Sequence, residues 1–158
     1  MTIYNETERS IYSKIGHYFP DYKNMRSETY LSVKSIKKFR DGLAVYQFPY
    51  EGYNRRTKYG DFYFLDKKKG IDMYVEISKL KAKNSVLAAR LGILFGLMKN
   101  INAKQIALVL IGEGYEETSD AMNDIITNRA KDIPKDKELI IFKTEDDFTK
   151  HIKSYFSS

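Results

Sequence analysis

Cysteine is absent from this 158-residue chain, and histidine and proline are scarce. Without cysteine, the protein has no disulfide, no thiol nucleophile and no cysteine-based zinc site. Its two histidines, His17 and His151, lie far apart in the sequence. We therefore do not expect a histidine-rich metal site or a Ser-His-Asp arrangement. These absences favour an intracellular protein, and we predict a cytoplasmic location.

Long apolar runs are also absent. The longest, residues 86–98, contains Arg90 and is shorter than a membrane-spanning helix requires, so it is typical of a buried helix. The N-terminal segment MTIYNETERS lacks the basic and apolar regions of a signal peptide. We expect no membrane partner. A chain of this length can form a single domain with a proper core.

The balance of charge is basic, with a formal net charge of +6. Positive charge permits contact with nucleic acid, because neutralising phosphates supplies most of the sequence-independent affinity. Tyrosines interleaved with these charges can stack on bases or can pack on a sheet surface. A lysine-rich surface without such a function is the alternative. The basic residues predicted to bind nucleic acid surround one hairpin: Arg55, Arg56, Lys58, Lys67, Lys68, Lys69 and Lys81.

That hairpin, residues 59–81, is the most informative stretch of the chain. Apolar residues alternate on both sides of a polar, glycine-ended connector at residues 67–70, which is a hairpin signal. Successive side chains of a strand point to opposite faces, so each strand has one apolar face. Placing both apolar faces toward the core fixes the register, with Phe64 opposite Met73 and Phe62 opposite Val75.

The same register places Asp61 opposite Glu76 on the second face of the hairpin. Directly opposed side chains have Cβ atoms roughly 4.5–5.5 Å apart, and two like charges there are destabilising unless a positive charge lies between them. A divalent cation fits, since Mg²⁺ binds oxygen ligands and is often held by one or two carboxylates. The sequence therefore predicts a Mg²⁺ or Mn²⁺ site. The alternative is a solvated polar face on which Lys or Arg neighbours balance the charge.

The rest of the chain alternates helices and strands. Asn5 followed by Glu8 resembles a capping box and predicts a helix over residues 5–19. Residues 25–39 fit either a helix or a strand. The remaining predicted strands are 42–48, 105–111 and 138–142, and the remaining predicted helices are 85–99, 119–132 and 145–156.

This order predicts an α/β protein, a single domain whose central mixed sheet has a β-meander followed by a βαβα unit and is flanked by helices. We divide it into an N-terminal helical segment (1–40), a hairpin and αβ core (41–112) and a C-terminal αβα extension (113–158). Gly92 and Gly96 can permit close packing of their helix against the sheet. The glycine pair at residues 112–114 lacks the downstream glycine and lysine of a phosphate-binding loop, so no nucleotide cofactor is expected.

The order α-β-β-β-α-β, with an acid starting its second strand and Glu-x-polar in its third, resembles the PD-(D/E)xK nuclease superfamily. Gly60-Asp61 stands in the place of Pro-Asp, and Glu76-Ile77-Ser78 stands in the place of Glu-x-Lys. The resemblance covers about residues 40–112 and implies a restriction-endonuclease-like fold. It also implies a metal-dependent phosphodiesterase that cleaves DNA or RNA.

Carried over to this chain, the resemblance makes Asp61 and Glu76 metal ligands and catalytic residues, with Ile77 adding its main-chain carbonyl. The metal, Mg²⁺ or Mn²⁺, would activate a water for attack on the phosphodiester. An acid of the N-terminal helix often supports such a site. Glu8 or Glu28 can take that place here.

The lysine of the motif is missing, because Ser78 stands in its position. By alternation Lys79 and Lys81 face the apolar side, although a bulge can turn one of them back toward the site. Lys58 or Lys99 can also arrive from elsewhere. We include Ser78 and Lys79 in the predicted catalytic set. Without a suitable lysine, the same fold serves as a catalytically inactive subunit that binds nucleic acid, a protein partner or a second copy of itself.

A second resemblance begins at residue 76. The stretch EISKLKAKNS is similar to the Asp-Leu-Ser-(five residues)-Asp-Ser stretch of STAS regulatory domains, with Ser85 at the position of the phosphorylated serine. Such domains place a helix before the third strand, where this chain has DFYFLDKKKG, and Asn84 replaces the usual acid. Three functions therefore stay open: a nuclease, an inactive binding subunit of the same fold, and a regulatory interaction domain.

Overall fold

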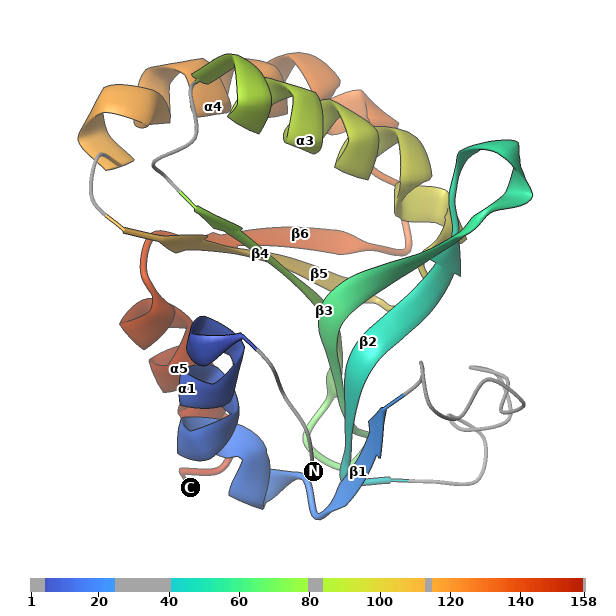
Figure 1. Cartoon of the computed structure of the whole chain (residues 1–158), viewed down its shortest axis with the longest axis vertical. Helices are drawn as coiled ribbons and strands as arrows, with labels where there is room; N and C mark the ends of the chain where they lie inside the picture. Colours follow the sequence, from blue (N-terminus) through green and yellow to red (C-terminus); the bar gives the residue numbers. More distant parts are fainter. Residues whose placement is uncertain (1–4, 25–40, 80–83, 113–114, 158) are drawn as a thin grey trace.

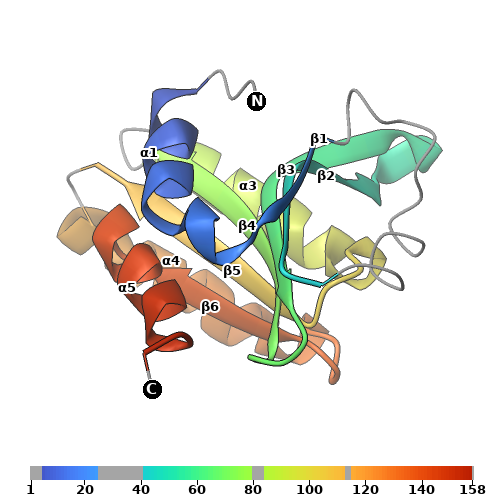
Figure 2. The same cartoon turned by 90° about the horizontal axis from the view of Figure 1, so that it is seen from below.

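Helices cover both faces of a central sheet in the computed structural model of the protein (Figure 1). The structure describes residues 5–24, 41–79, 84–112 and 115–157. Within these ranges no helix is long and apolar enough to cross a membrane. Two helices lie on each face (Figures 1 and 2): α1 (Glu6–Ile15) and α5 (Glu145–Ser154) on one, α3 (Asn84–Leu97) and α4 (Tyr115–Arg129) on the other.

The strands follow one another across a six-stranded sheet in chain order. The second to fourth strands form an antiparallel meander, and the other neighbours are parallel. The predicted mixed sheet, with a meander followed by parallel strands, is therefore confirmed. The strands are β1 (Asp21–Asn24), β2 (Leu43–Glu51), β3 (Thr57–Asp66), β4 (Ile71–Lys79), β5 (Gln105–Ile111) and β6 (Glu138–Phe142).

Strand β1 was not predicted, because its four residues, DYKN, carry no apolar alternation. The ambiguous segment 25–39 lies outside the described residues. Strands β5 and β6 have the predicted bounds, whereas α4 starts earlier than residue 119. Short 3₁₀ turns complete the chain: η1 (Gly16–Tyr18), η2 (Tyr53–Arg55), η3 (Met98–Asn100) and η4 (Ala130–Asp132).

The hairpin of β3 and β4 has the predicted loop and register. Phe62 pairs with Val75 and Phe64 pairs with Met73. The loop at residues 67–70 ends at Gly70, whose φ of 76° is a left-handed conformation that favours glycine. Alternation of apolar side chains was sufficient to fix this pairing, because a shift by one residue would turn the whole apolar set away from the core.

Both faces of this hairpin are covered. Phe62 and Phe64 face the core, as predicted, where they pack with buried residues of α1 and α5. The second face was considered as a solvated polar surface, and that alternative is wrong, because Tyr63 and Tyr74 are fully buried there with residues of α3. Strand β5 is likewise buried on both sides, as its continuous apolar run indicated. Acidic residues on the second face therefore lie beneath a helix.

The N-terminal helix begins as predicted at Asn5, whose Oδ1 accepts hydrogen bonds from the backbone N–H groups of Thr7 (2.9 Å) and Glu8 (3.2 Å). The predicted reciprocal half of the capping box is wrong. The Glu8 carboxylate instead accepts a hydrogen bond of 2.7 Å from the buried Tyr46 hydroxyl of β2. The cap therefore directs the Glu8 side chain into the protein.

The two glycines of α3 were expected to pack against the sheet, but they contact other elements instead. A Cβ at Gly96 would lie 2.5 Å from the Tyr53 hydroxyl of η2. The carbonyl of Gly92 accepts a hydrogen bond of 3.3 Å from Arg129 of α4. Helix α3 is also not buried on every side, since Ile93 is 48% exposed. The glycines thus allow contacts with the β2–β3 connection and with α4.

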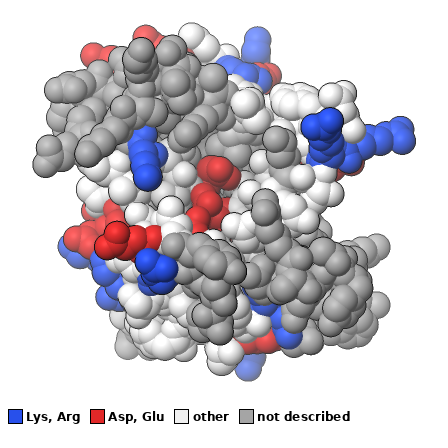
Figure 3. Space-filling model, viewed as in Figure 1, with Lys and Arg blue, Asp and Glu red and all other residues white. Residues whose placement is uncertain are grey.

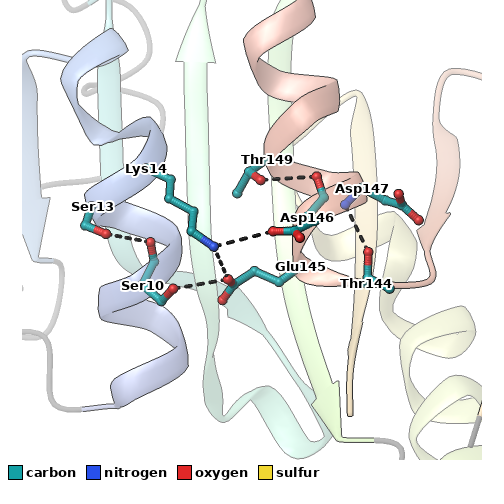
Figure 4. Close-up of polar contacts among 8 residues, drawn as sticks. All are labelled: Ser10, Ser13, Lys14, Thr144, Glu145, Asp146, Asp147 and Thr149. Carbon is teal, nitrogen blue, oxygen red and sulfur yellow. Dashed lines mark hydrogen bonds and ion pairs between the residues drawn. The ribbon is translucent and has the colours of Figure 1, made fainter. Parts of the chain in front are cut away.

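A polar contact joins the first and last helices (Figure 4). Lys14 Nζ lies 2.6 Å from Glu145 Oε2 and 3.5 Å from Asp146 Oδ1, and Ser10 Oγ donates to Glu145 Oε2 at 3.1 Å. The hydrogen bond to Glu145 raises the pKa of Lys14. This contact joins α1 to α5 at the surface, while the fully buried Ile11 and Ile15 pack α1 onto the sheet.

We expect Asn5→Ala to destabilise the protein by about 1 kcal/mol, because two backbone N–H groups lose their acceptor. For a domain of this size the loss corresponds to a fall of roughly 2–4 °C in Tm, measured by thermal unfolding. Asn5→Asp, which keeps the acceptor, is the control. Equal Tm values for Asn5→Ala and Asn5→Asp would contradict this role.

Candidate functional site

The sheet is interrupted beside Asp61 on the β2 side. The β2–β3 ladder is regular on either side of this point, but Gln47, which would face Asp61, has no partner in it. Gln47 has a φ of 65°, a left-handed conformation that is unfavourable for a residue with a side chain. Such local strain is typical of functional sites.

The sheet is also interrupted on the β4 side. The β3–β4 ladder ends at Phe62 and Val75, one pair before Asp61. Beyond that point, the Asp61 Oδ2 atom accepts a hydrogen bond of 2.7 Å from the backbone N–H of Ile77. A carboxylate thus replaces the main-chain partner that a continuing strand would supply. In an extended strand the N–H and C=O of one residue point to the same edge, so the Ile77 carbonyl also points toward Asp61.

Glu76 is held by the tyrosine two residues before it on the same face of β4. The Tyr74 hydroxyl donates a hydrogen bond to Glu76 Oε2. The Tyr74 ring is fully buried and lies directly on Gly60, where an added Cβ would overlap the ring. Gly60 is therefore required by the close approach of this ring, and the ring positions the Glu76 carboxylate.

A cavity of about 350 Å³ opens above these carboxylates, between the hairpin and α3. Its polar side is formed by Asp61, Glu76 and Ser78, and Ser78 is only 3% exposed. Its other side is apolar. Within the described residues no Lys or Arg lines it, and the remaining lining residues are Tyr50, Ile77, Leu91, Ile93, Leu94 and Leu108. Figure 3 shows acidic side chains near the middle of this side of the molecule.

A second recess, of about 250 Å³, reaches Asp61 from the α1 side of the sheet. Glu8 and Lys79 line it together with Asp61 and Ile77. Lys79 is therefore on the face opposite Ser78, as the alternation predicted. Of the two acids proposed to support the site, Glu8 lies beside Asp61, and Glu28 lies outside the described residues.

Asp61 has an unusual protonation equilibrium. Burial is the largest cause and the Glu76 charge is the second, and together they raise the pKa of Asp61 to about 8, against the hydrogen bond from Ile77 that lowers it. Glu8 adds a smaller upward contribution. Burial and then the Glu76 charge also raise the pKa values of Tyr50 and Tyr74. The site therefore concentrates negative charge in a place where water screens it poorly.

A metal ion here would depend on few side chains. Among the described residues, no group of three or more His, Cys, Asp or Glu is arranged to hold a metal. The oxygen-bearing groups available are the carboxylates of Asp61 and Glu76 and the main chain of Ile77, which line the same cavity. This is a set that suits Mg²⁺, which is usually held by one or two carboxylates and completes its shell with water and phosphate oxygens.

The predicted basic residues fall into two groups at opposite ends of β3. Arg55 and Arg56 are exposed at the β2–β3 connection, and Lys67, Lys68 and Lys69 are exposed in the β3–β4 loop. The Lys58 side chain and Lys81 lie outside the described parts. Lys99, considered as a replacement lysine, is exposed in η3 and does not line the cavity.

No family model, curated protein or solved structure matches this chain. The function must therefore be inferred from the site itself.

Several features of the site were not predicted. The positive φ of Gln47 and the apolar wall from α3 depend on tertiary structure and leave no sequence signal. The hydrogen bond from Tyr74 to Glu76 could have been predicted from the sequence, since residues two apart in a strand share a face. A glycine inside a strand, Gly60, also indicated the close approach of another group.

We expect Asp61→Asn to stabilise the protein in a pH-dependent manner. Asn keeps an oxygen acceptor for the Ile77 N–H but removes the carboxylate charge. Because the folded pKa of about 8 lies above the usual 3.8, folding favours the protonated form, and wild-type stability falls as pH rises from about 4 to about 8.

The gain from Asp61→Asn should therefore be small near pH 4.5 and at least about 1 kcal/mol near pH 8.5, roughly 2–4 °C in Tm. Thermal unfolding in the presence of a chelator measures it. An equal difference in Tm at both pH values would show that the Asp61 charge is not destabilising. Asp136→Asn, at an exposed position, is the matched control.

We expect Gly60→Ala to destabilise the protein by about 1–3 kcal/mol, because the added methyl group must displace the buried Tyr74 ring. Urea unfolding measures the change. In a Tyr74→Ala background the ring is absent, so Gly60→Ala should lower the free energy of unfolding by less than it does in the wild type. Purely additive effects would indicate that the ring is not what excludes a side chain at residue 60.

Proposed function

We propose that the protein is a metal-dependent phosphodiesterase, a nuclease of restriction-endonuclease-like fold that acts on DNA or RNA. The observation that carries the proposal is the pair of carboxylates, Asp61 and Glu76, beside an interruption of the sheet and within one cavity. Burial and, after it, the Glu76 charge raise the pKa of Asp61, and the repulsion between the two carboxylates is relieved if a divalent cation lies between them.

The arrangement of elements supports the proposal. Helix α1, the meander of β2 to β4, helix α3 and parallel strand β5 follow in the order that the PD-(D/E)xK resemblance implies. Asp61 is in the second strand of that meander and Glu76 is in the third. Glu8 of α1 lines a recess with Asp61, where the superfamily often has a supporting acid.

The donor set fits Mg²⁺ or Mn²⁺, which when bound would act as a Lewis acid and lower the pKa of a water that attacks the phosphodiester. The protein's own contribution is to orient the ligands. The Ile77 N–H fixes Oδ2 of Asp61, and the Tyr74 hydroxyl fixes Oε2 of Glu76. The leucines of α3 and β5 form the apolar opposite wall of the cavity.

The missing lysine distinguishes two versions of this function. Ser78 occupies the lysine position and lines the cavity, whereas Lys79 reaches Asp61 only through the recess on the α1 side. We infer that Lys79 serves the site from that face if the protein cleaves. Ser78 favours the second candidate function, a catalytically inactive binding subunit of the same fold.

A STAS-type regulatory domain is supported less well. That family requires a helix before its third strand, and residues 61–66 are instead the second half of strand β3. The Ser85 side chain lies outside the described parts of the chain.

We expect Mn²⁺ to raise the Tm of the wild-type protein. At a concentration about 100 times Kd, binding adds about 2.7 kcal/mol, which corresponds to roughly 5–10 °C for a domain of this size. The Asp61→Asn, Glu76→Gln double variant should lose this response, and Asp136→Asn should keep it. Plasmid, single-stranded DNA and RNA are then incubated with Mg²⁺ or Mn²⁺ to measure cleavage.

Cleavage by the wild type that survives in the double variant would refute the proposal, as would the absence of both metal response and cleavage. A metal response without cleavage would instead support the inactive subunit. In that case Ser78→Lys, which returns the lysine of the motif to the cavity, should produce cleavage.

A further inference from the structure

We propose that the substrate is single-stranded nucleic acid, with an unpaired base entering the 350 Å³ cavity while the β2–β3 connection holds the adjacent backbone. This inference rests on the proposed function and specifies which nucleic acid the same site accepts. Four observations carry it: an exposed apolar edge, the composition of the cavity, the position of two arginines, and a strained connection.

The exposed apolar edge is formed by Tyr53 and Ile93. These are the two large apolar side chains that stand exposed in the described part of the chain, at 55% and 48%. Ile93 lines the cavity, and the Tyr53 hydroxyl lies against Gly96, one helical turn further along α3. Residues three apart on a helix share a face, so both side chains lie on the same face of α3.

The apolar wall of the cavity suits a base, while its acidic side suits a metal ion that would hold the adjacent phosphate. Its lining joins an aromatic ring, Tyr50, and aliphatic side chains to the polar groups of Asp61, Glu76 and Ser78. Because the described lining has no Lys or Arg, the adjacent phosphate would depend on the metal ion and on cations outside the cavity. A cavity of this volume lies in the range that holds small ligands. The bases of a duplex are stacked inside it and leave no free face for such a wall, whereas an unpaired base has two.

The positive charge lies just outside the cavity. Arg55 and Arg56 are exposed in the same connection as Tyr53. The connection is anchored, because the Asn100 side chain donates a hydrogen bond of 2.8 Å to the carbonyl of Glu51. An aromatic side chain beside arginines is the combination that binds single strands, since the ring stacks on a base and the guanidinium groups contact phosphates.

The backbone of this connection is strained. Asn54 and Arg55 have φ values of 57° and 59°, so two successive residues with side chains adopt a left-handed conformation. Strain of this kind persists where the surrounding structure imposes it, often at ligand-binding sites. Here it sets the direction in which Tyr53 and Arg55 leave the chain, beside the open edge of the cavity.

Fluorescence anisotropy of the full chain tests the proposal with labelled oligothymidine of roughly 20 nucleotides and a blunt duplex of similar length. Ca²⁺ replaces Mg²⁺, so that binding is measured without cleavage. We expect the single strand to bind at least about 10-fold more tightly than the duplex. Tyr53→Ala should weaken single-strand binding about 5- to 100-fold, and Tyr53→Phe, which keeps the ring, should restore it.

The charge contribution is measured separately. Arg55→Ala with Arg56→Ala should reduce the slope of log Kd against log salt concentration by about 1.4, since each phosphate contact on a single strand contributes about 0.7. Lys150→Ala with Lys153→Ala removes the same charge from exposed positions on α5 and should leave the slope unchanged.

Each result has a distinct meaning. Equal or tighter binding of the duplex would overturn this inference and leave the nuclease proposal standing if cleavage depends on Asp61 and Glu76. Single-strand binding that needs Tyr53, without any cleavage, would uphold the inference and refute the nuclease proposal. No change on Tyr53→Ala, or capture of peptides in place of nucleic acid, would overturn the inference.

Discussion

The hydrogen bond from the Ile77 backbone N–H to the Asp61 carboxylate is the contact on which the site depends. It occurs where β3 stops pairing with β4, so one side chain replaces one main-chain partner. Because the N–H is satisfied, the sheet can open without leaving a buried donor unpaired. The opening is what admits a cavity between the hairpin and α3 and a recess on the α1 side, with Asp61 at the boundary of both.

The same contact requires compensation on either side. Strand β2 accommodates it by the left-handed conformation of Gln47, and β4 does so through Tyr74, which lies on Gly60 and holds Glu76. A hairpin built only for stability would continue its ladder and would place the two acids elsewhere. The protein instead places the half-buried Asp61 beside Glu76 at a cost in electrostatic free energy, which is typical of functional sites.

Much of this could be predicted from the sequence because it depends on local patterns. The period-2 alternation of the hairpin fixed the loop and the pairing of Phe62 with Val75, whereas the predicted pairing of Asp61 with Glu76 falls beyond the end of the ladder. The continuous apolar run of β5 indicated that both sides of the sheet are covered. Features set by distant contacts could not be predicted: the burial of the second face by α3, the inward turn of Glu8 to Tyr46, and the contact of Gly96 with Tyr53.

The position of the basic residues shows why proximity in sequence is a poor guide to a binding surface. The predicted basic residues are close together in the sequence. In the structure, however, the arginines and the lysines of the β3–β4 loop are separated by the whole length of β3. At about 3.3 Å per residue, Arg56 and Lys67 lie tens of ångströms apart, and Asp61 is between them. A nucleic acid that reaches Asp61 therefore need not contact both groups.

The two groups of basic residues also differ in their surroundings. The arginines lie beside Tyr53 and the edge of α3. The lysines of the β3–β4 loop lie near the C-terminus, with Lys69 over the Phe156 ring. The asymmetry favours approach of the substrate from the arginine end.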